Sequence, residues 1–396
     1  MRIALSTSVI QRGKSGVGQY VFALVKAMLS FADRHEFHLL VLEDDLPLFA
    51  FAAGRMKLVP VPEKWRPALR NIVWHQVVLP RWLRQQRMDV LHIPSYRRML
   101  WSAPCARVST IHDLAPFHVS GKYDWARMFY GRVVVRQLAR RQTQVIAISS
   151  NTAHDIRRFF GVEPSRLHII HNGIDHQRFT VGDAAQARHD AARRWRFDRP
   201  FFLYVSRLEH PAKNHVRLIE AFNQFKSQTG ADWLLVLGGS DWHGAEHIHA
   251  MAKTSPFVRD IRFLGFVPDD VLPELYRAAS AMVYPSLFEG FGFPPIEAMA
   301  CGCPVISSTR GSLGEVVGDA AEIVEPESVA SITSALCNMA TNEPRRTQLR
   351  TAGFHNARRF DWAMNAKQVI DTYERAVIEF GKGRMTGAKE TTFDRG

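Results

Sequence analysis

The sequence contains few cysteines, and none has the spacing of a metal site. The four cysteines are Cys105, Cys301, Cys303 and Cys337. Only Gly302 separates the middle two, which is too close for the paired ligands of a zinc knuckle. The pattern therefore predicts reduced, buried thiols, as in proteins of the cytosol.

Long apolar runs are also absent. No stretch approaches the roughly 20 apolar residues that a membrane-spanning helix needs. The N-terminal run Ile3–Ile10 is interrupted by Ser and Thr and followed by Gln-Arg-Gly-Lys, so it predicts a first buried strand and not a signal peptide. With 46% apolar and 22% charged residues, the composition is that of a folded globular protein.

Acidic residues are scarce in one half of the chain only. Residues 1–176 contain 25 Lys and Arg against 12 Asp and Glu, whereas residues 177–396 contain 26 of each kind. The whole net charge of +13 therefore lies in the N-terminal half. Such a one-sided field predicts a surface that faces an anionic partner. Nucleic acid is not expected, because no motif that reads nucleic acid accompanies the charge.

Two segments concentrate the basic residues. Lys64–Arg87 interleaves Lys and Arg with three tryptophans, and Arg127–Arg141 places arginines beside Phe129 and Tyr130. Basic side chains combined with interfacial aromatics predict binding to an anionic membrane surface. The alternative is two ordinary surface helices whose apolar stripes face their own core.

The 396 residues suit two domains of ordinary size. Short apolar runs alternate with helical stretches, which predicts parallel sheets with crossover helices. Strands are expected over 2–9, 38–42, 90–93, 107–112, 145–148, 201–206, 233–237, 261–264, 282–284, 304–307 and 321–324. Helices are expected over 17–31, 125–141, 151–160, 214–229, 269–279, 294–300, 313–317, 328–341 and 362–380.

These elements predict two doubly wound α/β domains that face each other across a cleft. The ligands of such sheets bind at the carboxyl ends of the strands, so we expect the site in the cleft. The expected divisions are an N-terminal domain over 1–176, a linker over 177–199, a C-terminal domain over 200–361, a helix over 362–380 that packs back on the N-terminal domain, and a flexible tail over 381–396.

The segment Phe288–Glu297 (F-E-G-F-G-F-P-P-I-E) carries the clearest chemical signal. Gly290 and Gly292 allow the backbone to approach a ligand closely, and the helix that starts next attracts an anion such as a diphosphate. Glu297 can accept two hydrogen bonds from a vicinal diol such as a ribose, and Glu289 can reach the hydroxyls of a sugar. As a short pattern, the segment is also compatible with a Gly-Pro turn that carries two solvated glutamates.

The full string resembles the retaining glycosyltransferases of family four, which have the GT-B fold. That family has two glutamates eight residues apart, matched by Glu289 and Glu297, and its E-G-F-G-hydrophobic-Pro core matches Glu289–Pro294. The resemblance extends over essentially the whole chain and implies an N-terminal acceptor domain and a C-terminal nucleotide-sugar domain. The donor-binding residues that it implies in this string are Glu289, Gly290, Phe291, Gly292, Phe293 and Glu297.

A second basic loop resembles the diphosphate site of the same family. A predicted strand ends in Ser206-Arg207, and Lys213-Asn214 opens the next helix. Arg207 and Lys213 would supply two cations for the oxyanion that grows as the sugar–phosphate bond breaks. Asn214 is also expected to cap that helix. In Arg310–Glu315, many relatives have Pro at the place of Gly314, which is expected to loosen a loop near the donor sugar.

Three motifs of the N-terminal half complete the resemblance. Ser15–Tyr20 (S-G-V-G-Q-Y) implies that Gly16 and Gly18 lie over the diphosphate, although a simple turn explains them as well. His112, at the end of a predicted strand, is expected near the anomeric carbon, and Asp113 is expected to orient it or to lie on the acceptor side. His92 ends another strand, where packing is as good an explanation as acceptor contact. The implied catalytic residues are His112, Arg207, Lys213 and Glu289.

No metal or other cofactor is expected. The sequence has no Asp-x-Asp signature in a donor loop and no cluster of His and carboxylates. Arg207, Lys213 and a helix N-terminus can supply the positive charge of a metal. The resemblance also implies retention of anomeric configuration, with attack on the front face and a leaving phosphate that helps to deprotonate the acceptor. It assigns no catalytic base.

The motifs look most like those of bacterial mannosyl- and rhamnosyltransferases of surface-polysaccharide assembly. GDP-mannose is therefore the first expectation for the donor, and nucleotide-activated deoxyhexoses are the alternatives. The expected acceptor is a saccharide or a polyprenyl-diphosphate-linked oligosaccharide of O-antigen type, on the cytoplasmic face of the inner membrane. A nucleotide-sugar epimerase and a non-catalytic protein that binds nucleotide sugars are the alternatives from other classes.

Overall fold

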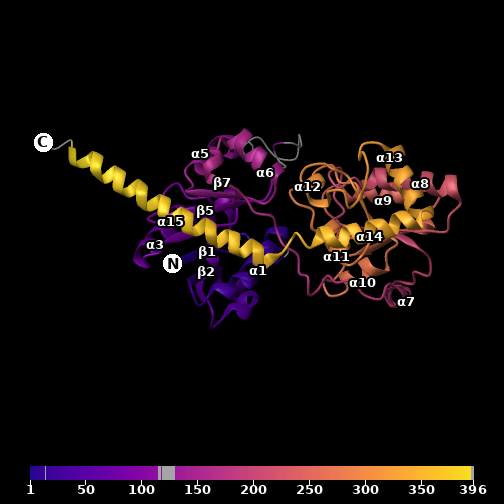
Figure 1. Ribbon diagram of the computed structural model, residues 1–396, viewed down its shortest axis with the longest axis horizontal. Helices are drawn as coiled ribbons and strands as arrows, with labels where there is room; N and C mark the ends of the chain where they lie inside the picture. The colour runs from indigo at the N-terminus through magenta and orange to yellow at the C-terminus, as the bar shows by residue number, and fades with distance from the viewer. Residues whose placement is uncertain (14, 115–116, 118–129, 394–396) are drawn as a thin grey trace. The chain divides into compact units, whose positions relative to one another are not determined.

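The chain divides into two compact units (Figure 1). The computed structural model describes residues 1–13, 15–114, 117 and 130–393. Unit 1 comprises Met1–Gly173 and Trp362–Gly396, and unit 2 comprises Ile174–Asp361. Both ends of the chain therefore contribute to unit 1, whereas unit 2 is one continuous segment. Each unit is built on a parallel sheet, which confirms the predicted fold class.

In the described part of unit 1, seven parallel strands form one sheet in the order β3-β2-β1-β4-β5-β6-β7. They are β1 (Arg2–Ser6), β2 (Glu36–Leu42), β3 (Lys57–Val61), β4 (Val90–Ile93), β5 (Ala106–Ile111), β6 (Gln144–Ala147) and β7 (Leu167–Ile169). The order reverses between β1 and β4, where doubly wound sheets bind their ligands. The sequence does not predict the two edge strands, because β3 contains Pro60 and β7 has three residues.

Helices pack around this sheet. They are α1 (Gly16–Met28), α2 (Ala68–Val73), α3 (Leu79–Gln85), α5 (Arg136–Arg140), α6 (Ser150–Asp155) and α15 (Trp362–Phe393), with π-helical turns at Trp74–Val78, Tyr130–Val135 and Ile156–Phe160. Ser15 fixes the start of α1, because its Oγ accepts the N–H of Gly18 at 3.1 Å. Residues 125–129 of the helix predicted over 125–141 lie outside the described residues.

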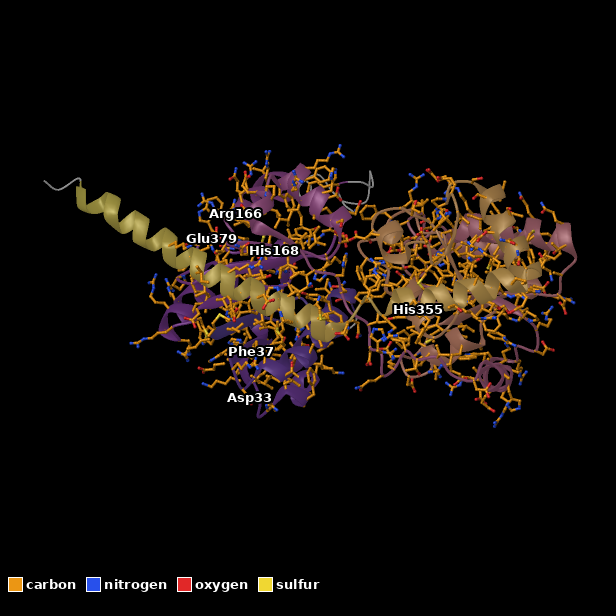
Figure 2. All side chains as sticks on the ribbon, viewed as in Figure 1. Asp33, Phe37, Arg166, His168, His355 and Glu379 are labelled. Atoms are coloured by element: carbon orange, nitrogen blue, oxygen red, sulfur yellow. The ribbon has the colours of Figure 1, made fainter. Side chains whose placement is uncertain are left out.

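Helix α15 packs on α1, β4 and β5 within unit 1 (Figure 1). It starts at Trp362 as predicted but runs to Phe393, further than the predicted 380. Gln144 of β6 anchors it, since the Gln144 amide donates to Glu379 while its carbonyl oxygen lies 2.7 Å from His168 Nε2. Figure 2 labels Glu379 and His168. The buried stripe of α15 has helical spacing and consists of Ala366, Val369, Ile370, Tyr373 and Ala376.

Unit 2, all of which is described, has six parallel strands in the order β10-β9-β8-β11-β12-β13. They are β8 (Phe201–Val205), β9 (Leu234–Gly238), β10 (Ile261–Gly265), β11 (Ala281–Tyr284), β12 (Val305–Ser307) and β13 (Glu322–Ile323). The helices are α7 (Ala184–Trp195), α8 (His215–Thr229), α9 (Ala245–Thr254), α10 (Leu272–Ala278), α11 (Phe293–Ala300), α12 (Leu313–Val317), α13 (Val329–Thr341) and α14 (Glu343–Ala357). The order reverses between β8 and β11.

The segment 177–199, predicted as a linker, is part of unit 2. Asp183 caps α7 there, since its Oδ1 accepts the N–H groups of Ala185 and Gln186 at 2.8 and 3.1 Å, and α7 packs on α10. The helix has too few apolar residues to be recognised by periodicity, because its buried positions are the small residues Ala187 and Ala191. Helices α9 and α14 likewise have no predicted counterpart.

Candidate active site

Arg207 lies just beyond β8, at the point where the strand order of unit 2 reverses. Its guanidinium carbon lies 4.8 Å from the centre of the Trp242 ring, and its Nη2 lies 3.4 Å from Glu209 Oε2. The side chain is 56% exposed, so this cation is positioned and still accessible to an anionic ligand. The Gly239 backbone comes close to Ser206, where a Cβ would stand 1.8 Å from the Ser206 carbonyl oxygen. The pair Gly238-Gly239 at the end of β9 is the sequence signal that could have indicated this contact.

Lys213 and Glu289 form an ion pair beside Arg207's strand end. Lys213 Nζ lies 2.6 Å from Glu289 Oε1, and the two side chains are 15% and 12% exposed. The Lys213 carbonyl oxygen accepts a hydrogen bond from the Tyr204 hydroxyl at 2.6 Å. Burial, and then the charge of Glu289, raises the pKa of Tyr204 well above its usual value, so Tyr204 stays a neutral donor. The structure thus brings together two of the predicted catalytic residues.

The backbone of Glu289 is held by the loop before α12. The Ser312 N–H donates to the Glu289 carbonyl oxygen at 3.0 Å, and the Ser312 Oγ lies 3.0 Å from the same oxygen. Gly311 has a φ of +66°, and a Cβ there would stand 2.4 Å from that oxygen. These two residues position Glu289, a role that no local pattern indicated. Gly314 lies within α12 and not in a loop, which corrects the expectation of a loosened loop.

The remaining residues of the glycine loop have mixed roles. Gly292 has a φ of +106°, and a Cβ there would stand 2.6 Å from Leu313 Cδ2. Phe291 is buried, and its ring lies 5.2 Å from that of Phe293 and 5.6 Å from that of Phe360. Its side chain therefore anchors the loop in the core, so a contact between Phe291 and the donor would have to use the backbone. Gly290 is half-buried and precedes this anchor.

Helix α11 offers few free donors at its start. It begins at Phe293, and the next two residues are Pro294 and Pro295, which have no N–H group. Phe293 therefore supplies the one backbone N–H among the first three helical positions. The start of α11 therefore offers an anion fewer backbone donors than the sequence predicts.

Glu297 lies on α11 with its carboxylate largely withdrawn from solvent. Burial raises the pKa of Glu297 to about 7, although the hydrogen bond from Tyr276 and the charge of Arg178 act in the opposite direction. The Tyr276 hydroxyl donates to Oε2 at 3.1 Å. The carboxyl group therefore changes its protonation near neutral pH.

Asn214 does not cap α8 as expected. It occupies the N-cap position with a φ of 62°, and its side chain makes no capping hydrogen bond. Instead, Nδ2 donates to the carbonyl oxygens of Pro285 and Pro326 at 2.9 and 2.6 Å. The buried amide thus ties the start of α8 to the loop that follows β11 and leads to Glu289.

Gly16 and Gly18 open α1 after β1 in unit 1. Gly18 is buried, and a Cβ there would stand 2.8 Å from the carbonyl oxygen of Ile10, so close backbone packing requires this glycine. Gly16 is exposed, and a Cβ there would meet no atom within 4 Å. Of the two predicted donor contacts, Gly16 is therefore the one that leaves room for a ligand.

His112 lies directly after β5. Its Nε2 lies 3.2 Å from the carbonyl oxygen of Pro94. Burial lowers the pKa of His112 to about 4, so the ring is neutral at pH 7. Asp113 follows and is half-buried, whereas residues 115–116 of the predicted motif lie outside the described residues.

His92 is fully buried in unit 1. Its Nδ1 lies 2.6 Å from the Tyr373 hydroxyl, and its Nε2 lies 2.8 Å from Thr110 Oγ1. Thr110 Oγ1 is also 3.2 Å from the hydroxyl of Tyr20, whose ring packs edge-on against His112 at 4.7 Å. Both nitrogens of His92 thus have partners inside the unit. This supports the packing alternative and corrects the prediction of acceptor contact.

In the basic segment Lys64–Arg87, the three tryptophans do not form the exposed aromatic face expected for membrane binding. Trp74 is buried in a core cluster, and Trp65 and Trp82 pack against it. The apolar side chains that do face solvent are Leu69, Val73 and Val77, with exposures of 79%, 50% and 44%. They follow one another at a spacing of four residues, and the exposed basic residues near them are Arg70, Arg81 and Arg84. In the second segment, residues 127–129 lie outside the described residues.

Two further properties concern the described residues alone. In residues 1–13, 15–114, 117 and 130–393, no three His, Cys, Asp or Glu side chains gather as a metal site would require. No helix in that part of the chain combines the length and the apolarity needed to cross a bilayer.

All four cysteines are free thiols; three are buried and Cys337 is half-buried. Burial raises the pKa of both Cys301 and Cys303 to about 12.

Two family models match the chain. The model described as "Glycosyltransferase Family 4" matches residues 14–178, and that of "Glycosyl transferases group 1" matches residues 186–356. The O-antigen chain mannosyltransferase B of Escherichia coli is 26% identical over 94% of this chain and 100% of its own length. The MMP alpha-(1->4)-mannosyltransferase of Mycolicibacterium hassiacum is 30% identical over 63% of this chain and 59% of its own.

Solved structures share the fold at lower identity. Anabaena HepE, in complex with UDP and glucose, has a TM-score of 0.73 and 19% identity, covering 94% of this chain and 99% of its own. WaaG, a glycosyltransferase involved in lipopolysaccharide biosynthesis, has a TM-score of 0.69 and 17% identity, covering 93% of this chain and 98% of its own.

Proposed function

Because the chain belongs to the glycosyltransferases of group 1 and family 4, with the GT-B fold, we propose that it is a retaining mannosyltransferase. Its donor would be GDP-mannose, and its acceptor a saccharide or lipid-linked saccharide of a bacterial surface polysaccharide such as O-antigen. The similarity to an O-antigen mannosyltransferase along the whole chain supports mannose, and so does the similarity to a second mannosyltransferase.

The ion pair between Lys213 and Glu289, 2.6 Å apart, is the observation that carries the proposal. It places a cation and a carboxylate together at the carboxyl edge of the unit 2 sheet. The cation suits a diphosphate, and the carboxylate can accept a hydrogen bond from a sugar hydroxyl. Arg207 adds an accessible second cation. Glu297 is assigned to the ribose diol, since its ionised carboxylate can accept two hydrogen bonds.

The reaction needs charge stabilisation at the leaving diphosphate. The bond between the anomeric carbon and the phosphate oxygen breaks, and Arg207 and Lys213 stabilise the negative charge that develops there. The acceptor oxygen forms the new bond on the same face, and its proton passes to the departing phosphate oxygen. We assign to His112 a hydrogen bond to the donor sugar, because its ring is neutral at pH 7.

No divalent metal takes part in this proposal. Two side-chain cations already balance the charge that a metal would neutralise in other transferases. Activity that persists unchanged in excess chelator would agree with this assignment. Loss of activity in chelator, restored by Mg²⁺ or Mn²⁺, would overturn it.

The proposed acceptor unit is unit 1, which also carries the basic excess. A lipid-linked acceptor would reach it from an anionic membrane surface, and the exposed stripe Leu69, Val73 and Val77 beside Arg70 and Arg81 suits shallow insertion. The test is flotation with anionic and with neutral vesicles. The triple change to Ser at the stripe should reduce flotation, whereas no flotation with anionic vesicles at low salt would overturn membrane binding.

The transferase itself is tested by measuring release of nucleoside diphosphate from a panel of nucleotide sugars. Release from GDP-mannose that requires an acceptor, and that falls on Lys213→Ala substitution, would support a mannosyltransferase. Conversion of the nucleotide sugar into an isomer without release would identify an epimerase. Binding without either reaction, with acceptor extracts present, would indicate a non-catalytic protein.

A further inference from the structure

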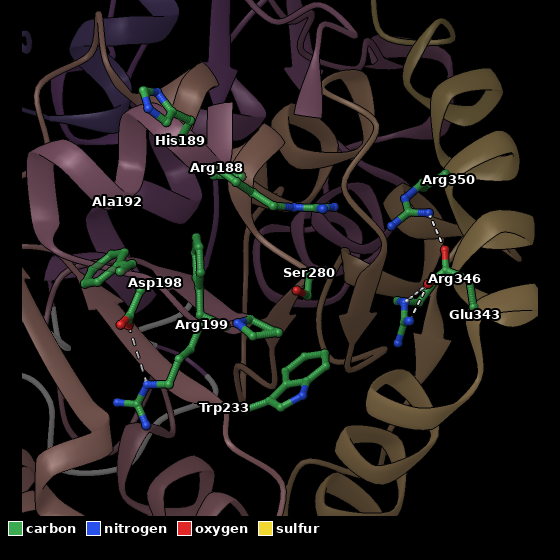
Figure 3. A pocket seen from close by; sticks show the side chains of 14 residues that line it. Arg188, His189, Ala192, Asp198, Arg199, Trp233, Ser280, Glu343, Arg346 and Arg350 are labelled. Atoms are coloured by element: carbon green, nitrogen blue, oxygen red, sulfur yellow. Dashed lines mark hydrogen bonds and ion pairs between the residues drawn. The ribbon is translucent and has the colours of Figure 1, made fainter. Parts of the chain in front are cut away.

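A cavity of about 420 Å³ lies in unit 2 (Figure 3). Its lining contains no residue of the proposed donor site. Phe201, the first residue of β8, lines it, as do Trp233 before β9 and Ser280 before β11. The cavity therefore opens at the amino edge of a parallel sheet, whereas Arg207 and Glu289 follow the carboxyl ends of β8 and β11. The two places are on opposite edges of the same sheet.

Guanidinium groups from two helices converge on this cavity. Arg188 comes from α7, and Arg346 and Arg350 come from α14. The Glu343 carboxylate accepts hydrogen bonds from both arginines of α14. Its Oε2 lies 2.7 Å from Arg346 Nε, and its Oε1 lies 2.8 Å from Arg350 Nη1. Figure 3 shows Arg188 reaching across the cavity towards α14. Three guanidinium groups and one carboxylate leave an excess of positive charge.

The fourth arginine of the lining contributes less to that excess. Arg199 Nη1 pairs with Asp232 and, at 3.0 Å, with Asp260, and its Nε lies 3.8 Å from Asp198 Oδ1. Its charge is therefore balanced locally. The anion-binding capacity is thereby concentrated between Arg188 on one wall and Arg350 on the other, whose side chain is 33% exposed.

The floor of the cavity is aromatic. Phe197 and Phe201 pack together with ring centres 5.3 Å apart, and Trp233 lies beside them in the lining. Aromatic faces of this kind bind the planar or apolar side of a sugar or a base. Guanidinium groups bind phosphate oxygens through two parallel hydrogen bonds. The wall and the floor together suit a molecule that has both parts.

We propose that this cavity binds a phosphate monoester of a ring compound, such as a sugar phosphate. The phosphate would lie between Arg188 and Arg350, and the ring would lie over Trp233. This is a second ligand site, separate from that for the nucleotide sugar, and it does not depend on the proposed transferase activity.

The test is calorimetric titration of the full-length Lys213→Ala protein, in which the proposed donor site is impaired. Glucose 6-phosphate and AMP serve as probes, with inorganic phosphate and glucose as partial ligands. We expect at least one ester to bind more tightly than inorganic phosphate, and glucose not to bind. Failure of both esters to bind at millimolar concentration would overturn the proposal.

Variants locate the binding. Arg188→Ala and Arg350→Ala should each weaken binding of the ester at least about tenfold. Trp233→Ala should weaken binding of the ester more than it weakens binding of inorganic phosphate. Arg193→Ala is the matched control, because Arg193 is an exposed arginine of α7 outside the cavity. Equal losses in Arg193→Ala and Arg188→Ala would show a general charge effect and contradict the site.

Discussion

The hydroxyl of Tyr276 donates a hydrogen bond to Glu297 Oε2 at 3.1 Å and so joins α10 to α11. Burial raises the pKa of this carboxyl to about 7, while the Tyr276 hydrogen bond lowers it. The proposed ribose contact is therefore sensitive to pH in the neutral range, and Tyr276 adjusts where the change occurs.

We expect affinity for GDP-mannose to fall as the pH drops through about 7, by about tenfold per unit once Glu297 is protonated. A protonated carboxyl accepts the diol less well than a carboxylate. In Tyr276→Phe, loss of the hydrogen bond raises the pKa further, so the midpoint should move to higher pH. Titrations at about pH 6, 7 and 8 measure this, and affinity that is constant over that range would contradict the assignment.

Glu297→Gln should stabilise the fold at alkaline pH while it weakens donor binding. The pKa of Glu297 is raised on folding, from 4.5 to about 7, so its contribution is fully favourable below about pH 4.5 and is lost as the pH rises through 7. Glutamine does not ionise. The free energy of unfolding of Glu297→Gln should therefore exceed that of the unchanged protein by near zero at about pH 4 and by about 2–3 kcal/mol at pH 8. Urea unfolding at both pH values checks the difference.

Lys213→Ala should lower kcat by about 10²–10³ and destabilise unit 2 by about 3 kcal/mol. The stability loss arises because the substitution leaves Glu289, 12% exposed, without its ion-pair partner. Lys213→Met combined with Glu289→Leu should recover most of the stability but no activity. Lys253→Ala, at an exposed position of α9, is the control and should change neither quantity.

Gly311→Ala should abolish most activity, because its Cβ would displace the carbonyl oxygen of Glu289, which would stand 2.4 Å away. The matched control is Gly230→Ala. Gly230 has a similar φ of +62°, but a Cβ there meets no atom within 4 Å, so it should cost about 1 kcal/mol of stability and leave activity unchanged. Similar activity losses in both variants would refute the positioning role of Gly311.

Tyr373→Phe should destabilise unit 1 by about 1–3 kcal/mol, since it leaves the buried His92 Nδ1 without its partner at 2.6 Å. The KM for an acceptor should not change, because His92 is enclosed in the core. Guanidinium unfolding and acceptor kinetics measure the two effects. A raised acceptor KM with unchanged stability would restore His92 as an acceptor residue.

The sequence predicts best those site residues that share one short string. Glu289 and Glu297 stand eight residues apart, so their relation is visible directly. Tyr276 and Ser312, which hold them, come from other elements and have no spacing that marks them. His92 shows the opposite error: its place at a strand end suggests a ligand, but Tyr373 on α15 covers it from 281 positions away.

The fold was predictable to the same degree. Buried central strands such as β8 are continuous apolar runs, and the prediction places their ends to within one residue. The linker prediction fails at α7, because a helix that buries only alanines on α10 has the composition of a loop. Of the edge strands, β3 and β7 of unit 1 were not predicted, because β3 contains Pro60 and β7 has three residues, whereas β10 and β13 of unit 2 were predicted.

The discontinuity of unit 1 sets an order of events during synthesis. Unit 2 is complete once residue 361 has left the ribosome, whereas unit 1 waits for α15, whose Tyr373 and Ala366 fill its core. Unit 2 is thus the first unit whose chain is complete. Unit 1 lacks part of its core until α15 has been synthesised. A nascent chain stopped before residue 362 would carry a finished unit 2 attached to an open, aggregation-prone sheet.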